Sequence, residues 1–336
     1  PETAVDAKQL TSTSDRDPGF ARERSMGTLT VGKLPDHHTT AKAIEWVTQQ
    51  AKEDKPFFLS MNLQSSHFPY LVPKGAEKPF QPCELDSSIG FVNYAESDVP
   101  RVKNAYFNAI HECDNQVGRL VDALRRNGQL EKTILIVTGE NGEAFHECGG
   151  SVTHAREPVE PAIHVACVFH APGLLEPRVD DYPLEHVDLV PTICGLLGMT
   201  ERPNFQGIDV LAAERIPSER RLIFNHVNSC LAQCDAVVLG GRWKLTTNRL
   251  ENFATLFDVQ RDPNQEVNLF HKRNDLAQAL QERLETWRSQ QLSYYHFPQY
   301  YLNFYAPKPP TWNLDSTTSF VSTEDTKSSV IRTDKQ

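Results

Sequence analysis

The sequence predicts an α/β protein with a mostly parallel sheet flanked by helices and a smaller carboxyl-terminal subdomain. The main observation is the apolar run at residues 133–137, which lacks alternation and is typical of a strand buried on both faces. The amphipathic pattern of residues 102–124 precedes this run, and a helix followed by such a strand is half of a βαβ unit. Short strand-like segments separated by turns between residues 222 and 258 predict an antiparallel sheet in the subdomain.

Bulk composition is that of an ordinary globular chain. The 336 residues, 39% hydrophobic and 23% charged, suffice for one large domain or two ordinary ones. A formal net charge of −10 argues against nucleic acid as the main partner, because that role usually needs a basic face. No apolar run approaches the roughly 18 residues of a membrane span, and the first residues show no signal-peptide pattern. Composition leaves the compartment and the oligomeric state open.

The first half of the chain predicts two helices and two strands. An amphipathic pattern starts at Thr39 and stops at the lysine and proline before residue 57. Residues 56–63 predict a buried strand, and the loop after it carries His67 between fixed prolines. The long helix of residues 102–124 ends at Gly128 and leads into the central strand.

The second half predicts another buried strand at residues 163–170 and a helix from Asp188 through Leu196 that Asp188 caps. The subdomain is expected to contain four short strands and a final helix, at residues 222–225, 236–239, 243–246, 255–258 and 276–287. Four regions follow: an irregular segment (1–36), the α/β core (37–215), the subdomain (216–295) and an aromatic and proline-rich tail (296–336). The last ~20 residues are expected to be disordered.

Seven cysteines are scattered along the chain, and only Cys230 and Cys234 lie close together in sequence. A structural zinc site would need a second pair or two histidines at ligand spacing, and none follows. A local disulfide or two free thiols is therefore the preferred interpretation.

The predicted site lies at the carboxyl end of the run at residues 133–137, where the chain changes to Thr-Gly-Glu140-Asn141-Gly-Glu. Ligands of open α/β sheets bind outside the carboxyl ends of the strands. Carboxylate and amide oxygens suit a hard cation. The alternative is an Asn-Gly turn that closes a hairpin, and the unalternating strand before it favours the metal site.

The chain resembles the sulfatase family of the alkaline-phosphatase-like superfamily. The resemblance rests on motifs in one order along the chain: Lys-Pro-Phe-Phe-Leu at 55–59 with Ser-His-Phe-Pro-Tyr at 66–70, residues 106–120 with 133–142, residues 153–173 with 186–192, and Gly-Arg-Trp-Lys at 241–244 with 256–269. It implies a metal-dependent hydrolase of sulfuric esters. The implied cation is Ca²⁺, with Mn²⁺ or Zn²⁺ as alternatives.

The resemblance also assigns residues. Glu140 and Asn141 fall where the family's acidic-plus-Asn metal pair stands, and His67 and His154 are expected to be catalytic and to contact the ester. Lys74 and Arg156 are substrate-binding candidates, as cations near the proposed anion site. The alternatives are ordinary loop histidines and solvated surface charges. Sulfated small molecules or glycans are the implied substrates, and an extracytoplasmic location (periplasmic, secreted or lysosomal) is implied too.

The sequence departs from the family pattern in two places. The first metal ligand is usually Asp, and here it is Glu140. Its surroundings are more similar to the branch of lipoteichoic-acid-synthase-like phosphotransferases, so phosphoryl transfer or phosphodiester hydrolysis is the second hypothesis. The family's Cys/Ser-x-Pro-x-Arg nucleophile motif is absent. We therefore expect a carboxyl-terminal portion of a longer enzyme that is inactive alone; a sulfatase-like binding protein without chemistry is the third hypothesis.

Overall fold

The computed structural model describes residues 34–53, 55–229 and 232–312. The chain divides into two compact units. The first takes in the chain up to His146 together with Val165–Pro177, and the second takes in Glu147–His164 and the chain from Arg178 onward. The four predicted regions remain a prediction, and residues 1–33 and 313–336, which hold the irregular start and the disordered end of that prediction, lie outside the described residues.

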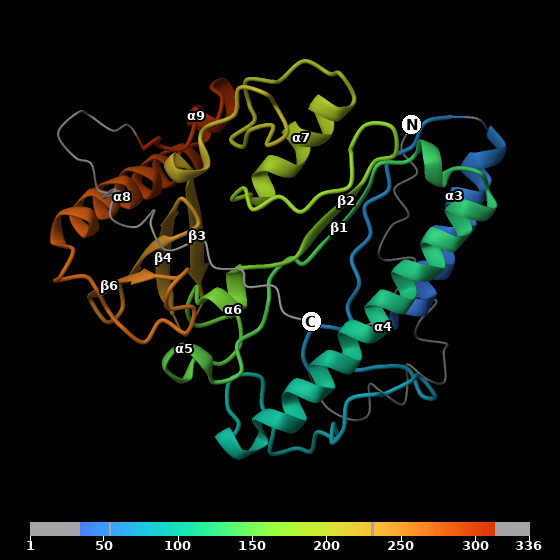
Figure 1. Cartoon of the computed structure of the whole chain (residues 1–336), viewed down its shortest axis with the longest axis horizontal. Helices are drawn as coiled ribbons and strands as arrows, with labels where there is room; N and C mark the ends of the chain where they lie inside the picture. The colour runs from blue at the N-terminus through green and yellow to red at the C-terminus, as the bar shows by residue number, and fades with distance from the viewer. Residues whose placement is uncertain (1–33, 54, 230–231, 313–336) are drawn as a thin grey trace, which may run out of the picture. The chain divides into compact units, whose positions relative to one another are not determined.

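Two helices lie side by side in the first unit, α3 (Asp36–Glu53) and α4 (Val99–Arg126) (Figure 1). Apolar side chains of both helices and of the turn after α4 form a common core: Ala43, Val47, Leu120, Leu124 and Leu130. Both amphipathic predictions are confirmed, and α4 stops as predicted where Gly128 takes a φ of +66°. The start of α3 is held by the buried carboxylate of Asp36, which accepts hydrogen bonds from the backbone N–H groups of Gln64 (2.6 Å) and Ser65 (2.8 Å).

The predicted strand at residues 56–63 is wrong, because this stretch belongs to no described ladder. Phe57, Leu59 and Met61 pack against the core of α3 and α4. The intervening Phe58 is 79% exposed. Only alternate side chains are therefore partly buried, and the apolar run of the sequence did not reveal that the other face is exposed to solvent.

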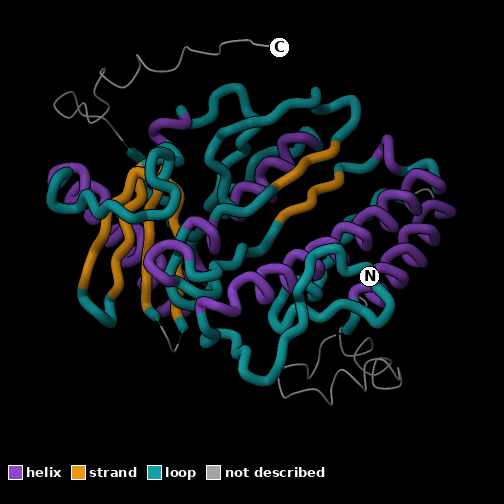
Figure 2. The backbone as a smooth tube through the Cα atoms, turned by 60° about the horizontal axis from the view of Figure 1, so that its bottom comes forward, coloured by secondary structure: helices purple, strands orange, loops and turns teal. Residues whose placement is uncertain are grey.

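β1 (Leu135–Thr138) and β2 (Cys167–His170) pair with each other in the first unit (Figure 2). Their register joins Leu135 to His170 and Thr138 to Cys167, so the pair is antiparallel. The described strands form no parallel pair, which differs from the predicted mostly parallel sheet. A run of β-branched residues favours a strand of either direction. Val137 of β1 is 38% exposed and Val168 of β2 is 60% exposed, so the predicted burial of residues 133–137 on both faces is wrong, as is the predicted burial of β2.

The second unit contains the predicted antiparallel sheet. Its strands follow one another in space in the order of the chain, β3 (Leu222–Asn228), β4 (Gln233–Leu239), β5 (Trp243–Asn248) and β6 (Phe253–Asp258). Gly240 and Gly241 both have positive φ, which permits the tight reversal between β4 and β5. α8 (Asn274–His296) covers one face through Leu276, Leu280 and Leu284. The α/β class with a smaller antiparallel-sheet subdomain is thus confirmed.

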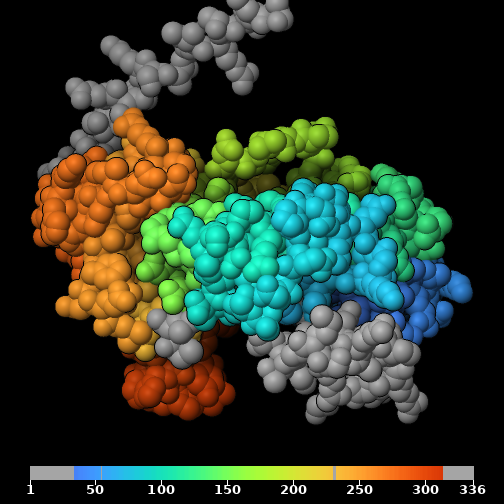
Figure 3. Space-filling view, turned by 90° about the horizontal axis from the view of Figure 1, so that it is seen from below, coloured from blue at the N-terminus to red at the C-terminus, as the bar shows by residue number. Residues whose placement is uncertain are grey.

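The connections contain short helices: α5 (Glu147–Gly150), α6 (Glu160–Ile163), α7 (Leu189–Leu196) and α9 (Pro298–Asn303), with 3₁₀ turns η2 (Glu96–Asp98), η3 (Leu130–Lys132), η4 (His186–Asp188) and η5 (Ser218–Arg220). The segment of α9 stands out from the surface of its unit (red in Figure 3) and exposes Leu302, Phe304 and Tyr305. Among the described helices, none is both long and apolar enough to span a bilayer.

Candidate functional site

The end of β1 is fixed by backbone contacts with β2. The N–H of Gly139 donates to the carbonyl of Ala166 (3.2 Å), and Thr138 Oγ1 donates to the same carbonyl (3.1 Å). A Cβ at Gly139 would lie 3.2 Å from the Val165 side chain, so the glycine permits this close approach. The predicted ligands that follow Gly139 are therefore attached to a defined strand end.

Glu140 and Asn141 are both exposed at this strand end. Asn141 donates its Nδ2–H to the carbonyl of Gly142 (2.7 Å), which leaves the amide Oδ1 directed away from that bond. Within the described residues the Glu140 carboxylate has no hydrogen bond or ion pair. Two adjacent oxygen donors of this kind suit a hard cation, although such a cation takes six to eight oxygens. Among the residues that the structure describes, no group of three His, Cys, Asp or Glu side chains converges as a metal site.

Glu143 is a site residue that the sequence did not predict. Its side chain is buried, and Tyr70 Oη donates a hydrogen bond of 3.0 Å to its carboxylate. Burial, and then the negative charge of Glu143, raise the pKa of Tyr70 above its ordinary value, so the phenol remains a donor. Tyr70 lies in the left-handed region with a φ of +60°, a conformation that a residue other than glycine adopts at a cost. This contact ties the loop after β1 to the loop that carries His67.

The imidazole of His67 is oriented by its own loop. Its Nδ1 lies 2.7 Å from the carbonyl of Phe68, and because a carbonyl only accepts, Nδ1 carries the proton and Nε2 is the basic nitrogen. The ring stacks against Phe91 with an interplanar angle of 12° and a centroid distance of 6.3 Å. Lys74 lies seven residues further along the chain, exposed in the turn that the Ala76 N–H closes on the Pro73 carbonyl (3.0 Å). The first unit therefore holds His67, Lys74, Glu140 and Asn141.

His154 and Arg156 belong to the second unit, in the loop between α5 and α6. Thr153 precedes them with a φ of +66°, and its Oγ1 accepts a hydrogen bond from the Ala155 N–H (2.9 Å). The Ala155 carbonyl in turn accepts a hydrogen bond from Ser229 Oγ (2.8 Å). His154 is half-buried and Arg156 is exposed. The two predicted residues are thus held by a fixed loop of their own unit.

The flanking residues His146 and Cys148 have local contacts. His146 has a φ of +67°, and its Nε2 lies 3.2 Å from the carbonyl of Tyr94. Cys148 lines a cavity of about 80 Å³ in the second unit together with Cys234, and burial raises the pKa of both thiols. Cys234 is a free thiol. Cys230, with which a local disulfide or two free thiols were predicted, lies outside the described residues.

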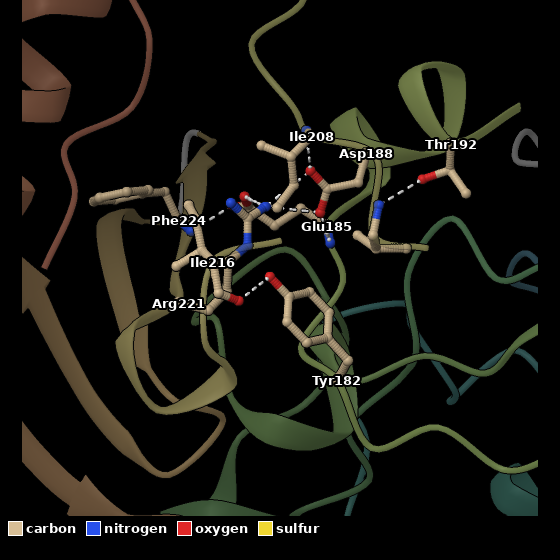
Figure 4. Close-up of polar contacts among 9 residues, drawn as sticks. Tyr182, Glu185, Asp188, Thr192, Ile208, Ile216, Arg221 and Phe224 are labelled. Atoms are coloured by element: carbon tan, nitrogen blue, oxygen red, sulfur yellow. Dashed lines mark hydrogen bonds and ion pairs between the residues drawn. The ribbon is translucent and has the colours of Figure 1, made fainter. Parts of the chain in front are cut away.

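A buried charge network supports the second unit (Figure 4). Arg221 Nη2 lies 2.7 and 2.8 Å from the two carboxylate oxygens of Asp188 and 2.9 Å from Glu185. Asp188 also accepts hydrogen bonds from the backbone N–H groups of Glu185 (2.9 Å) and Ile208 (2.8 Å). The prediction that Asp188 caps the following helix is wrong, because its oxygens are used by these partners and α7 has no side-chain cap. Burial raises the pKa of Glu185 to about 7.

Comparisons with known proteins show which family the chain resembles. The family model described as Sulfatase matches residues 5–199, more than half of the chain. Arylsulfatase K of Mus musculus is 22% identical over 297 residues, which cover 75% of this chain and 53% of the relative. Iduronate 2-sulfatase of Homo sapiens is 24% identical over 229 residues, which cover 51% of this chain and 41% of the relative. The chain thus spans about half the length of the curated relatives it matches.

Solved structures with a similar fold include that of Ps i-CgsB in complex with k-i-k-neocarrahexaose. It aligns with a TM-score of 0.62 and 18% identity over 86% of this chain and 67% of that one. The phosphonate monoester hydrolase SpPMH from Silicibacter pomeroyi aligns with a TM-score of 0.53 and 17% identity over 74% of this chain and 59% of that one. At these identities the likeness concerns the fold alone.

Proposed function

Because this chain belongs to the sulfatase family, as the match over residues 5–199 shows, we propose that it serves the hydrolysis of sulfuric esters and helps to hold a divalent cation. The observation that carries the proposal is the pair Glu140 and Asn141 at the end of β1. Both are exposed, and the Asn141 amide uses its nitrogen in a local hydrogen bond, so its oxygen is the group left to bind a cation.

Ca²⁺ is the proposed cation, since both donors are oxygens, whereas imidazole or thiolate ligands would favour Zn²⁺ or another transition metal. Such an ion, when bound, supplies positive charge that polarises the ester. Glu140 and Asn141 would be two of its ligands, and further ligands have to come from other residues. We propose a positioning role for Glu143, because its buried carboxylate accepts the hydrogen bond from Tyr70 Oη that joins the two loops.

The two histidines and the two basic side chains have proposed roles in binding the ester. Nε2 of His67 is the basic nitrogen, because Nδ1 donates to the Phe68 carbonyl, and it can contact an ester oxygen or hold its proton. We propose the same contact for His154, and an electrostatic contribution to anion binding for Lys74 and Arg156. The positively charged side chains of Lys74 and Arg156 favour the binding of an anionic ester, whether the group transferred is sulfuryl or phosphoryl.

The proposed substrate is a sulfated glycan or small molecule in an extracytoplasmic compartment. Support comes from the names of relatives, which include an iduronate 2-sulfatase and an endo-4-O-sulfatase. Phosphoryl chemistry is the second candidate, because Glu140 replaces the usual Asp and the fold is shared with a phosphonate monoester hydrolase. A sulfatase-like binding protein is the third, because this sequence lacks a Cys/Ser-x-Pro-x-Arg motif.

We propose that this polypeptide alone has no turnover, since the nucleophile motif is missing from its sequence. Assays of an aryl sulfate and an aryl phosphate with the chain should therefore give no hydrolysis above background. Hydrolysis that Glu140→Ala abolishes would contradict this part of the proposal. A Cys/Ser-x-Pro-x-Arg motif encoded upstream in the same gene would remove the binding-protein alternative.

Cation binding is tested separately by titrating Ca²⁺ into the ¹⁵N-labelled chain. We expect saturable shifts of the Glu140, Asn141 and Gly142 amides, lost in Glu140→Ala and in Asn141→Ala. Glu131→Ala is the matched control, because it removes an exposed carboxylate of the same unit that lies before β1. Equal shifts in wild type and Glu140→Ala would refute the assignment of this carboxylate as a ligand.

A further inference from the structure

Two guanidinium groups and one imidazole converge on a single buried carboxylate in the second unit, away from the predicted site residues in the sequence. Asp235 on β4 is 1% exposed, and its Oδ1 lies 2.5 Å from Nδ1 of His226 on β3. Its Oδ2 is contacted by Arg249, which follows β5, and lies 3.2 Å from Nε of Arg288 on α8. These four residues are called the Asp235 cluster below.

The sheet and α8 build this arrangement. His226 and Asp235 face each other as cross-strand partners, so their side chains leave the sheet on the same face. That face carries Val237 and Leu239 into the core under α8, two and four residues after Asp235. α8 lies along this face beside β4 (Figure 1), which places Arg288 next to Asp235. The cluster is therefore fixed by three strands and one helix.

The charges of the Asp235 cluster do not balance. The two guanidiniums face one carboxylate, so the cluster has a net charge of at least +1 on a chain whose formal net charge is −10. The pKa of Arg249 is lowered by burial and then by the charge of Arg288, and the pKa of His226 is lowered by burial and then by both arginines. A second anion beside the guanidiniums would relieve this repulsion.

Unused donors of the cluster face solvent. Nε of Arg288 is buried and lies 3.2 Å from Asp235 Oδ2 as an ion pair without a hydrogen bond, and among the described residues no protein group accepts a hydrogen bond from its Nη1 or Nη2. The side chain of Arg288 is 37% exposed. The fork of a guanidinium matches the oxygens of a sulfate or phosphate group. The ion pair with Asp235 keeps the guanidinium beside the carboxylate, so less side-chain entropy is lost when an anion binds.

We propose that Arg249 and Arg288, held beside Asp235, form a second anion-binding site, within the second unit, which takes a sulfate group of a polyanionic glycan. This inference rests on the proposed function for its ligand, because a tetrahedral oxyanion is the shared chemistry and a sulfated glycan supplies it at a second position. The guanidiniums bind the sulfate through charge-assisted hydrogen bonds.

The test is a calorimetric titration of the full chain with a disulfated disaccharide in the presence of a chelator. The chelator removes the cation, so this binding does not depend on Glu140 or on turnover. We expect Arg288→Gln and Arg249→Gln each to weaken binding at least about tenfold, since a hydrogen bond to a charged group contributes that much to an association constant. Arg288→Lys, which keeps the charge but not the fork, should give an intermediate loss.

Arg283→Gln is the matched control, because it removes a guanidinium from the same helix that contacts Glu282 and Trp312 instead of Asp235. It should leave the affinity within about twofold of wild type. Each Arg-to-Gln variant at the cluster leaves Asp235 one guanidinium, so the fold is retained, as near-ultraviolet circular dichroism would verify. An equal loss in Arg283→Gln, or no loss at the cluster, would overturn the site.

Two further measurements complete the test. One distinguishes free sulfate from a glycan as the ligand, and the other distinguishes failure of this site from failure of the proposed function. Inorganic sulfate that binds the cluster as tightly as the disaccharide would overturn the glycan as ligand, because a free anion would then suffice. Glu140→Ala should bind the disaccharide unchanged in chelator. A loss in Glu140→Ala with no loss in Arg288→Gln would place the glycan at the strand end of the first unit, which overturns the second site and leaves the proposed function intact.

Discussion

Glu185→Gln is expected to make the protein more stable at alkaline pH. The side chain of Glu185 is 11% exposed, and burial raises its pKa from 4.5 to about 7 despite the nearby Arg221 and the N–H of Phe224. The folded state therefore binds the proton more tightly than the unfolded chain. Because one pKa unit corresponds to about 1.4 kcal/mol, ionised Glu185 lowers the free energy of unfolding by about 3 kcal/mol.

The pH window follows from the sign of this difference. Below about pH 4.5 the carboxyl is protonated in both states, so its full favourable contribution is present. As the pH rises to about 7 the unfolded chain loses the proton first, and the contribution is lost as the folded carboxyl ionises. Glutamine cannot ionise, yet its Oε1 can still accept the hydrogen bond from Phe224 N–H, which is 2.7 Å long in the wild type.

The assay is urea unfolding from pH 4.5 to 8, followed by tryptophan fluorescence. Trp243, Trp287 and Trp312 lie in the second unit, and Trp46 of the first unit is replaced by Phe in wild type and variants alike so that the signal reports on the second unit. The advantage of Glu185→Gln over wild type should grow by about 3 kcal/mol across this range. Glu201→Gln is the control, because that side chain is 64% exposed, and it should show no such growth. A difference for Glu185→Gln that stays constant or shrinks with pH would refute the reasoning.

Two further predictions concern local packing. Gly207→Ala should destabilise the second unit by about 2 kcal/mol or more in urea unfolding, because a Cβ there would overlap the backbone at Val187, whereas Gly118→Ala in open space on α4 should stabilise by about 0.5–1 kcal/mol. Equal effects of the two substitutions would contradict this overlap as the cause. Tyr70→Phe should cost about 1.5–3 kcal/mol through the lost hydrogen bond to Glu143, and Tyr106→Phe, which removes no bond to Glu143, should be nearly neutral. A neutral Tyr70→Phe would show that the two loops are held by other contacts.

Local patterns in the sequence predicted the elements whose stability is local. The stripe of α4, the double glycine between β4 and β5 and the leucines of α8 are each visible within a few residues, because helical and strand periodicities repeat at short range. The buried strand at residues 56–63 failed for the opposite reason. Its apolar residues indicated burial, but whether a neighbouring strand pairs with them is decided elsewhere in the chain.

The same distinction applies to the candidate site. The end of β1 was predicted correctly as the point where Glu140 and Asn141 leave a strand, because the change from apolar to polar residues is local. The contact of Tyr70 with Glu143 joins residues 73 apart, and neither residue alone indicates the other. The Asp235 cluster likewise draws on three strands and a helix. Long-range polar contacts of this kind depend on the packing that the hydrophobic pattern only partly specifies.

Glu140 and Asn141 are the two proposed ligands, and by themselves they can hold a cation only weakly. Glu140 supplies one negative charge and Asn141 one neutral oxygen, whereas Ca²⁺ sites of high affinity use six to eight oxygens and several carboxylates. A Kd of roughly millimolar or weaker is therefore expected for Ca²⁺ and the chain alone. A micromolar Kd that depended on Glu140 would require further oxygen ligands from this polypeptide and would contradict the estimate made from two ligands.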